Sequence, residues 1–156
     1  MTQTETAIKE AFVAKFKDKV TEITIPRKRR IWTVVDRDVL SESVRYLALE
    51  YDMTHLATVS CTDNDGYIEV LYHLLARGHN IRMTVSSRAP KDDCWLPSVT
   101  PVIPGAYQYE AEVWEMMGVD FKNHPGLFHV ELPDNWGDKG FPLRKDWIFD
   151  RRPYNE

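Results

Sequence analysis

Residues 95–147 are the stretch that decides how this chain folds, and they read WLPSVTPVIPGAYQYEAEVWEMMGVDFKNHPGLFHVELPDNWGDKGFPLRKDW. Within them, residues 106–117 form a helix-length run without Gly or Pro. The run ends at Gly118, and glycine is the residue that most easily adopts the left-handed conformation of a helix C-cap. Apolar residues fall on nearly every side of this predicted helix, so we expect it to be buried on several sides.

Three glutamates, Glu110, Glu112 and Glu115, interrupt the apolar pattern of the predicted helix. A carboxylate on a largely buried helix needs a cation or hydrogen-bond donors nearby. Within the chain, Arg144 and Lys145 are candidates for that role, and a partner protein is the other source.

The segment after the helix, residues 119–156, contains four prolines and several aromatic residues among charged ones. Such a segment cannot build its own core and is usually held against another surface. Aromatic side chains carry much of the energy of protein interfaces, which favours an interface role for Trp136, Phe141 and Trp147, with core packing as the alternative. For Trp114, on the helix, core packing is the better interpretation.

The rest of the chain alternates between helix and strand patterns. The order α-β-β-α-β-β-β, then a loop and a helix, predicts an α+β fold with helices packed on a mostly antiparallel or mixed sheet and a long irregular C-terminal segment. At 156 residues the chain suits a single domain. We divide it into three parts: an α/β core over residues 1–105, the buried helix over residues 106–118, and an extended interface tail over residues 119–156.

Composition excludes several function classes. A net charge of −4 argues against a general nucleic-acid binder, and no apolar run is long enough to span a bilayer. No phosphate-binding glycine motif is present, and the two cysteines, Cys61 and Cys94, are too few for an iron–sulfur cluster with four thiolate ligands. We therefore expect no cofactor and no metal.

Three motifs carry a family resemblance. They are EAEVWEMMGVDF followed by HP at residues 110–121 and 124–125, LPDNW at residues 132–136, and PLRKDW at residues 142–147. In type and spacing they resemble the signature of the C subunit of respiratory complex I, a domain also found in the related membrane-bound, energy-converting nickel–iron hydrogenases. The matched residues, for which the resemblance implies a place at the partner interface, are Glu110, Glu112, Trp114, Gly118, Phe121, His124, Pro125, Pro133, Asp134, Trp136, Pro142, Leu143, Arg144, Lys145, Asp146 and Trp147.

The chain departs from the family pattern at a few positions. Ala111 stands where the family has arginine, Glu115 where it has aspartate, and Met117 where it has phenylalanine, while Phe128 and His129 replace two arginines. These changes, with the compact length, favour the hydrogenase-like or archaeal branch. Because Glu112 matches a glutamate of the family motif on a helix with apolar sides, we expect it to be buried and paired in the assembled state.

The resemblance implies a non-catalytic, cofactor-free docking subunit in the hydrophilic arm of a complex that couples electron transfer to ion translocation. The implied partners are the large, hydrogenase-like catalytic subunit and the small iron–sulfur subunit. The implied location is cytoplasmic, peripheral to the membrane and without a membrane span of its own. In this interpretation the chain is part of an oxidoreductase but performs no chemistry itself.

Two alternatives from other classes stay open at this point. A small free-standing enzyme could use Glu110, Glu112, Glu115 and His124, although no nucleophile or oxyanion donor at recognisable spacing accompanies them. A nucleic-acid module could use the basic run at residues 27–30, for which the simpler interpretation is a solvated turn between two strands.

Overall fold

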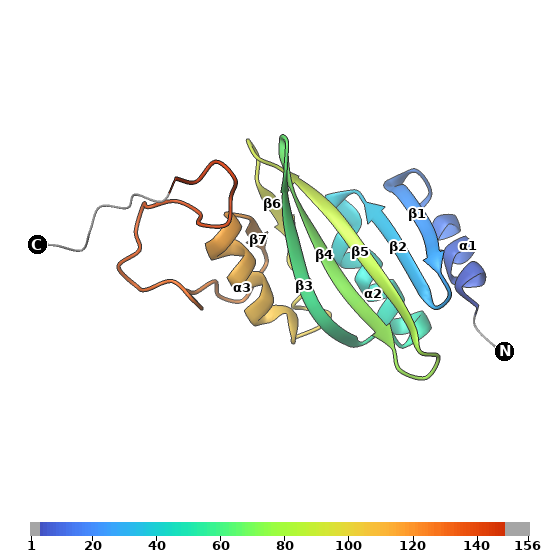
Figure 1. The fold of residues 1–156 in the computed structure, drawn as a ribbon. Helices are drawn as coiled ribbons and strands as arrows, with labels where there is room; N and C mark the ends of the chain where they lie inside the picture. The colour runs from blue at the N-terminus through green and yellow to red at the C-terminus, as the bar shows by residue number, and fades with distance from the viewer. Residues whose placement is uncertain (1–3, 149–156) are drawn as a thin grey trace, which may run out of the picture.

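The structure is a computed structural model that describes residues 4–148. Five strands form one sheet in the order β1-β2-β5-β4-β3, in which β2 and β5 run parallel and every other neighbouring pair is antiparallel (Figure 1). The strands are β1 (Val20–Arg27), β2 (Arg30–Val35), β3 (His55–Asn64), β4 (Tyr67–Ala76) and β5 (Ile81–Pro90). A separate pair of short parallel strands consists of β6 (Trp95–Pro97) and β7 (Asp120–Lys122).

Three helices cover the sheet: α1 (Glu5–Phe16), α2 (Leu40–Tyr51) and α3 (Ala106–Met117). In Figure 1, α1 lies beside β1 at one end of the molecule, α2 lies behind the sheet, and α3 lies at the other end beside β3. Strand β4, which lies between β5 and β3, alternates between buried and half-buried residues along its whole length, as expected when one face of a strand meets the core. One hydrophobic core therefore joins the sheet to all three helices.

These elements confirm the predicted α+β class with a mixed, mostly antiparallel sheet. The predicted helix over residues 106–117 is α3, and Gly118 closes it in the left-handed conformation with φ of 70°. Two short strands, β6 and β7, were not predicted, because three residues are too few to show an alternating pattern. Residues 149–156 of the predicted tail lie outside the described part of the chain.

Within residues 4–148 no helix has the length and apolar character needed to cross a membrane.

Candidate interface formed by α3 and the segment after it

Helix α3 is tied into the domain through Glu110, which is completely buried. Its carboxylate accepts hydrogen bonds from the Tyr72 hydroxyl at 2.9 Å, the Val99 backbone N–H at 2.8 Å, the Thr100 hydroxyl at 3.1 Å and the Ser98 hydroxyl. The charge is thus stabilised by dipolar donors from β4 and from the loop before α3. Burial, together with the neighbouring Glu110 charge, raises the pKa of Tyr72, which keeps its hydroxyl a donor.

Glu115, further along α3, holds the segment that follows the helix. Its side chain is buried and accepts hydrogen bonds from three consecutive backbone N–H groups, those of Val130, Glu131 and Leu132, at 3.1, 2.7 and 3.2 Å. The Nδ1 atom of His129 also lies 3.2 Å from this carboxylate. One side chain therefore determines the path of four residues that belong to neither a helix nor a strand.

Arg144 fixes the last described part of the chain to the C-terminal end of α3. Its Nε atom donates to the Met117 carbonyl at 2.7 Å, and Nη2 lies 3.4 Å from the Gly118 carbonyl. Its guanidinium also lies over the Phe141 ring, 4.6 Å from the ring centroid. A cation at this end of a helix satisfies carbonyls that have no partner within the helix and interacts favourably with the helix dipole.

Gly118 has a second role besides its left-handed conformation. The ring of Phe141 packs so closely against it that a Cβ atom at position 118 would overlap the ring. Glycine is therefore required here both by φ and by the close approach of the tail.

A buried aspartate provides another attachment point. Asp63, near the end of β3, is 6% exposed, lies 2.6 Å from the Lys91 ammonium and accepts the Lys145 backbone N–H at 2.8 Å. The hydrogen bond from Lys91, followed by that of the Lys145 backbone, lowers the pKa of Asp63. The tail is thereby held to the sheet as well as to α3.

The expectation that Glu112 is paired with Arg144 or Lys145 is wrong within the chain. Glu112 is exposed and forms no ion pair with any residue of the described range 4–148, while Arg144 binds helix carbonyls instead. The apolar pattern could not show which glutamates are covered within the chain, because apolar residues fall on nearly every side of α3. Glu112 lies near Cys61, whose pKa is raised to about 11 by burial and, secondarily, by the Glu112 charge.

The tail presents several of its apolar side chains outward. Four large ones are 36–86% exposed: Phe128, Phe141, Leu143 and Ile148. Tyr107 of α3, 37% exposed, stacks on His124 and on Phe128 with ring centroids 4.8 and 5.4 Å apart, so this group continues onto the helix. Such a cluster on a small domain is typical of a protein–protein contact surface.

The other motif residues differ in their exposure and in what they contact. Trp136 and Trp147 face each other with ring centroids 6.0 Å apart, and their indole N–H groups donate to the Gly140 and Lys139 carbonyls. Both therefore shape the tail. The exposed members are Pro125, Pro133, Asp134, Lys145 and Asp146, whereas Phe121 is buried, Trp114 is half-buried against the core and Pro142 is half-buried.

Sequence reasoning missed the residues that bind the buried carboxylates and the tail: Tyr72, Ser98, Thr100 and Asp63. Two of them could have been found from the sequence: a buried glutamate needs hydrogen-bond donors, and the two hydroxyl residues in the loop before α3 are close to it in sequence. Tyr72 and Asp63 lie on strands far away in sequence and carried no such signal.

The glutamates do not form a catalytic cluster. Glu110 and Glu115 occupy separate hydrogen-bond networks and Glu112 is exposed, while the Nε2 atom of His124 lies 3.0 Å from the Tyr107 carbonyl. Within residues 4–148 no group of three His, Cys, Asp or Glu side chains is arranged to hold a metal ion.

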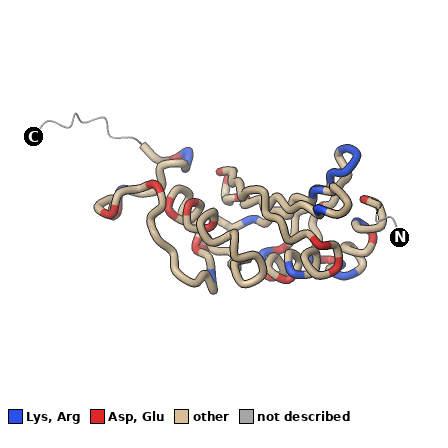
Figure 2. The backbone as a smooth tube through the Cα atoms, turned by 90° about the horizontal axis from the view of Figure 1, so that it is seen from below, with Lys and Arg blue, Asp and Glu red and all other residues tan. Residues whose placement is uncertain are grey.

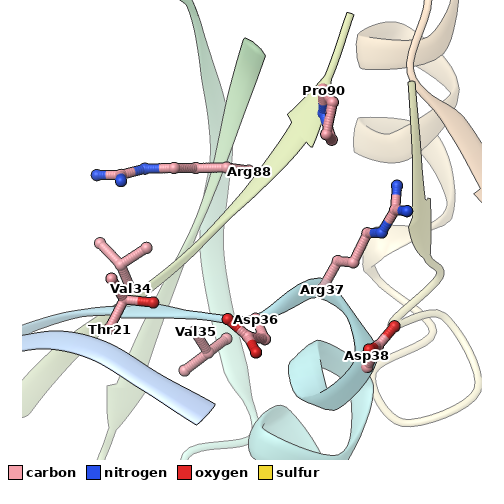
Figure 3. A pocket seen from close by; sticks show the side chains of 8 residues that line it. All are labelled: Thr21, Val34, Val35, Asp36, Arg37, Asp38, Arg88 and Pro90. Atoms are coloured by element: carbon pink, nitrogen blue, oxygen red, sulfur yellow. The ribbon is translucent and has the colours of Figure 1, made fainter. Parts of the chain in front are cut away.

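A hollow of about 310 Å³ lies between β1, β2, β5 and the turn before α2 (Figure 3). Its walls are charged, but three of these charged side chains already form ion pairs within the chain. Asp36 pairs with Lys19 at 3.1 Å, Arg37 with Asp93 at 2.6 Å, and Arg88 lies 3.5 Å from Glu69. Figure 3 also shows the guanidinium groups of Arg37 and Arg88 pointing in different directions. This hollow offers no convergent set of groups for a ligand.

The same fold and motifs occur in a known family. The chain belongs to the family described as respiratory-chain NADH dehydrogenase, 30 Kd subunit, which matches residues 33–153. The resemblance drawn from the three motifs is thereby confirmed.

Two curated relatives illustrate this membership. The chain is 34% identical over 140 residues to the C subunit of the F(420)H(2) dehydrogenase of Methanosarcina mazei, covering 88% of each protein. It is 34% identical over 120 residues to the C/D subunit of the NADH-quinone oxidoreductase of Methylococcus capsulatus, where the match covers 69% of this chain and 20% of that longer protein.

Two solved structures share the fold. A chain of the membrane-bound sulfane sulfur reductase, an archaeal respiratory membrane complex, superposes with a TM-score of 0.79 at 23% identity, over 96% of this chain and 95% of that one. A trypsin-resistant fragment of Nqo5 superposes with a TM-score of 0.66 at 24% identity, over 77% of this chain and 96% of the fragment.

The attachment of the tail by Arg144 leads to a first prediction. Arg144→Ala removes the donors to the Met117 and Gly118 carbonyls, so residues 141–148 should leave α3 while the sheet and its core remain folded. We expect a loss of about 1–2 kcal/mol in the free energy of unfolding. Hydrogen exchange should become much faster in residues 141–148, whereas amides of β4 and β5 should change by no more than the loss of global stability requires. Arg45→Ala, on the exposed side of α2, is the control, and equal exchange in both variants would contradict the role of Arg144.

Proposed function

We propose that this chain is a non-catalytic docking subunit in the hydrophilic arm of a complex I-like or energy-converting hydrogenase complex, one that couples electron transfer to ion translocation. Family membership supports the class of assembly. The names of the relatives, the C subunit of an F(420)H(2) dehydrogenase and the C/D subunit of an NADH-quinone oxidoreductase, support a place in a multisubunit respiratory complex.

The main observation in favour of a docking role is the way in which residues 118–148 are held in place. Apart from β7 it has no regular structure, yet three side chains, Glu115, Asp63 and Arg144, hold it in place. It uses this fixed path to present Phe128 and Leu143 to the outside. A backbone held by buried polar anchors while its apolar side chains face outward is suited to bind a preformed partner surface.

We assign the large, hydrogenase-like catalytic subunit as the partner that covers this surface, with the small iron–sulfur subunit adjacent. The placement that follows is cytoplasmic and peripheral to the membrane. Glu112, exposed on α3 beside this surface, is then available to pair with a basic side chain of the partner in the assembled complex. The chain itself supplies no redox chemistry in this proposal.

The test uses apolar-to-charged changes at exposed positions, which leave the fold intact. Leu143 is 57% exposed and lies in the tail, while Leu49 is 76% exposed and lies on α2, away from it. Leu143→Asp and Phe128→Asp should each weaken assembly by about 2 kcal/mol or more if the side chains are buried at the interface. Leu49→Asp is the matched control.

The measurement is co-purification of the other subunits with a tagged chain expressed in its own host, quantified by mass spectrometry. We expect a hydrogenase-like large subunit to co-purify with the wild type and with Leu49→Asp, and to be depleted with Leu143→Asp and Phe128→Asp. Full recovery with both tail variants would move the interface away from the tail. Absence of any respiratory subunit with the wild type would reject the proposed function.

A further inference from the structure

The turn between β1 and β2 carries a second charged surface, at the end of the molecule away from the tail. Arg27, Lys28, Arg29 and Arg30 follow one another there, and Figure 2 shows them as a dense blue stretch near the N-terminal end. Arg82, at the start of β5, lies directly beside Arg30 in the parallel β2–β5 pair. The five cationic side chains thus come from three strands and one turn.

These side chains surround a hollow of about 310 Å³. Its walls consist of Arg27, Lys28, Arg29, Arg30, Asn80 and Arg82, and no acidic residue is among them. The volume corresponds to that of on the order of ten water molecules in the liquid, which is enough for a small hydrated anion or a lipid headgroup.

The cluster differs from several basic residues on or next to the sheet, which form ion pairs. Lys19, Arg37, Arg88 and Lys91 each pair with a carboxylate. In the part of the chain that the structure describes, none of the five cluster residues forms an ion pair. The nearby Glu5 accepts the backbone N–H of Arg29, and its pKa is lowered by backbone hydrogen bonds and further by the charges of Lys28 and Arg29. Glu5 thus offsets part of the charge of the turn, but it does not line the hollow.

The positive charges of the cluster lie close enough to act on one another. Partial burial, together with the positive charges of Arg82 and Arg27, lowers the pKa of Arg30. In a chain with a net charge of −4, carboxylates were available to relieve this repulsion, and the fold does not place any of them in the hollow. A concavity lined by charges of one sign attracts counter-ions, so this hollow favours an anion from outside.

We propose that this hollow binds a phosphate group, either of a free phosphate compound or of an anionic phospholipid headgroup. A phosphate offers up to two negative charges and several acceptor oxygens arranged in three dimensions, whereas a carboxylate offers one charge in one plane. Arginine side chains that line the hollow from the turn and from two neighbouring strands can supply donors for such a group. This site is separate from the docking surface and does not depend on the proposed function.

The experiment measures binding to the full chain with two kinds of probe. Inorganic phosphate and pyrophosphate are titrated by calorimetry and by amide chemical shifts of the residues around the hollow. Vesicles of phosphatidylglycerol mixed with phosphatidylcholine, and of phosphatidylcholine alone, are used for co-sedimentation. Polyglutamate serves as the carboxylate probe, and melting temperatures show that each variant is folded.

Two double variants with equal charge change give the comparison. Arg30→Gln/Arg82→Gln removes two donors of the hollow, and Lys9→Gln/Arg45→Gln removes two charges from α1 and α2. We expect the first to bind the phosphate probe roughly tenfold or more weakly, since charge-assisted hydrogen bonds are lost, and the second to bind like the wild type.

The results distinguish the two sources of the phosphate group, and they can also overturn the proposal. Binding of inorganic phosphate or pyrophosphate identifies a free phosphate compound, and binding only to phosphatidylglycerol vesicles identifies a lipid headgroup. The proposal is overturned if neither probe binds, if the two double variants bind equally, or if polyglutamate binds more tightly than every phosphate probe. In the last case the hollow is a site for an acidic protein segment.

Discussion

Glu110→Ala is expected to lower the free energy of unfolding by roughly 4 kcal/mol or more. The substitution leaves four buried donors without an acceptor: the hydroxyls of Tyr72, Ser98 and Thr100 and the Val99 N–H. Each buried donor left unsatisfied costs on the order of 1–3 kcal/mol, and a domain of this size has only about 5–15 kcal/mol in total. A large fraction of the variant should therefore be unfolded near physiological temperature.

Glu112→Ala is the matched control for this prediction. It removes the same side chain from the same helix, but Glu112 is exposed, so its effect should stay within about 0.5 kcal/mol. Urea unfolding followed by tryptophan fluorescence and circular dichroism measures both. If the two variants lose similar stability, the network around Glu110 does not hold α3 in place. Glu110→Gln, which keeps one acceptor oxygen, should fall between them.

Glu115→Ala is expected to affect the tail more than the core. The carboxylate accepts the N–H groups of Val130, Glu131 and Leu132, which are only partly buried. Without it, these groups can turn toward water, so the global stability should fall by about 1–3 kcal/mol while residues 129–132 lose their fixed path. Because the tail presents Phe128 and Leu143 outward, the loss of that path should also strongly reduce assembly.

Hydrogen exchange and co-purification together test this second prediction. Amides of residues 130–132 should exchange much faster in Glu115→Ala than in the wild type, and recovery of the proposed large partner subunit should drop. Glu131→Ala, an exposed neighbour, is the control and should do neither. Fast exchange with undiminished assembly would mean that this part of the tail does not contribute to the interface.

Both predictions depend on features of α3 that the sequence showed only in part. Its length, its glycine stop and its need for donors to buried carboxylates followed from residues 106–118 alone, because helix periodicity and capping are local properties. Within the chain, Glu110 and Glu115 are the buried glutamates, and the expected burial of Glu112 in the assembled state stays a prediction. Periodicity could not rank the three glutamates, because apolar residues occur on nearly all sides of the helix.

The sequence by itself determined the α+β class, the order of the main helices and strands, and the family, since these depend on local patterning and on motifs of fixed spacing. Tertiary structure alone decided how the tail is held. Asp63 meets Lys145 across 82 residues, and Tyr72 meets Glu110 across 38. It also placed Arg82 beside the turn at residues 27–30. Contacts of this kind arise when segments far apart in the sequence come together in the fold. They include the crossover between the parallel strands β2 and β5 and the path of the tail back to β3, and no local pattern in the sequence encodes them.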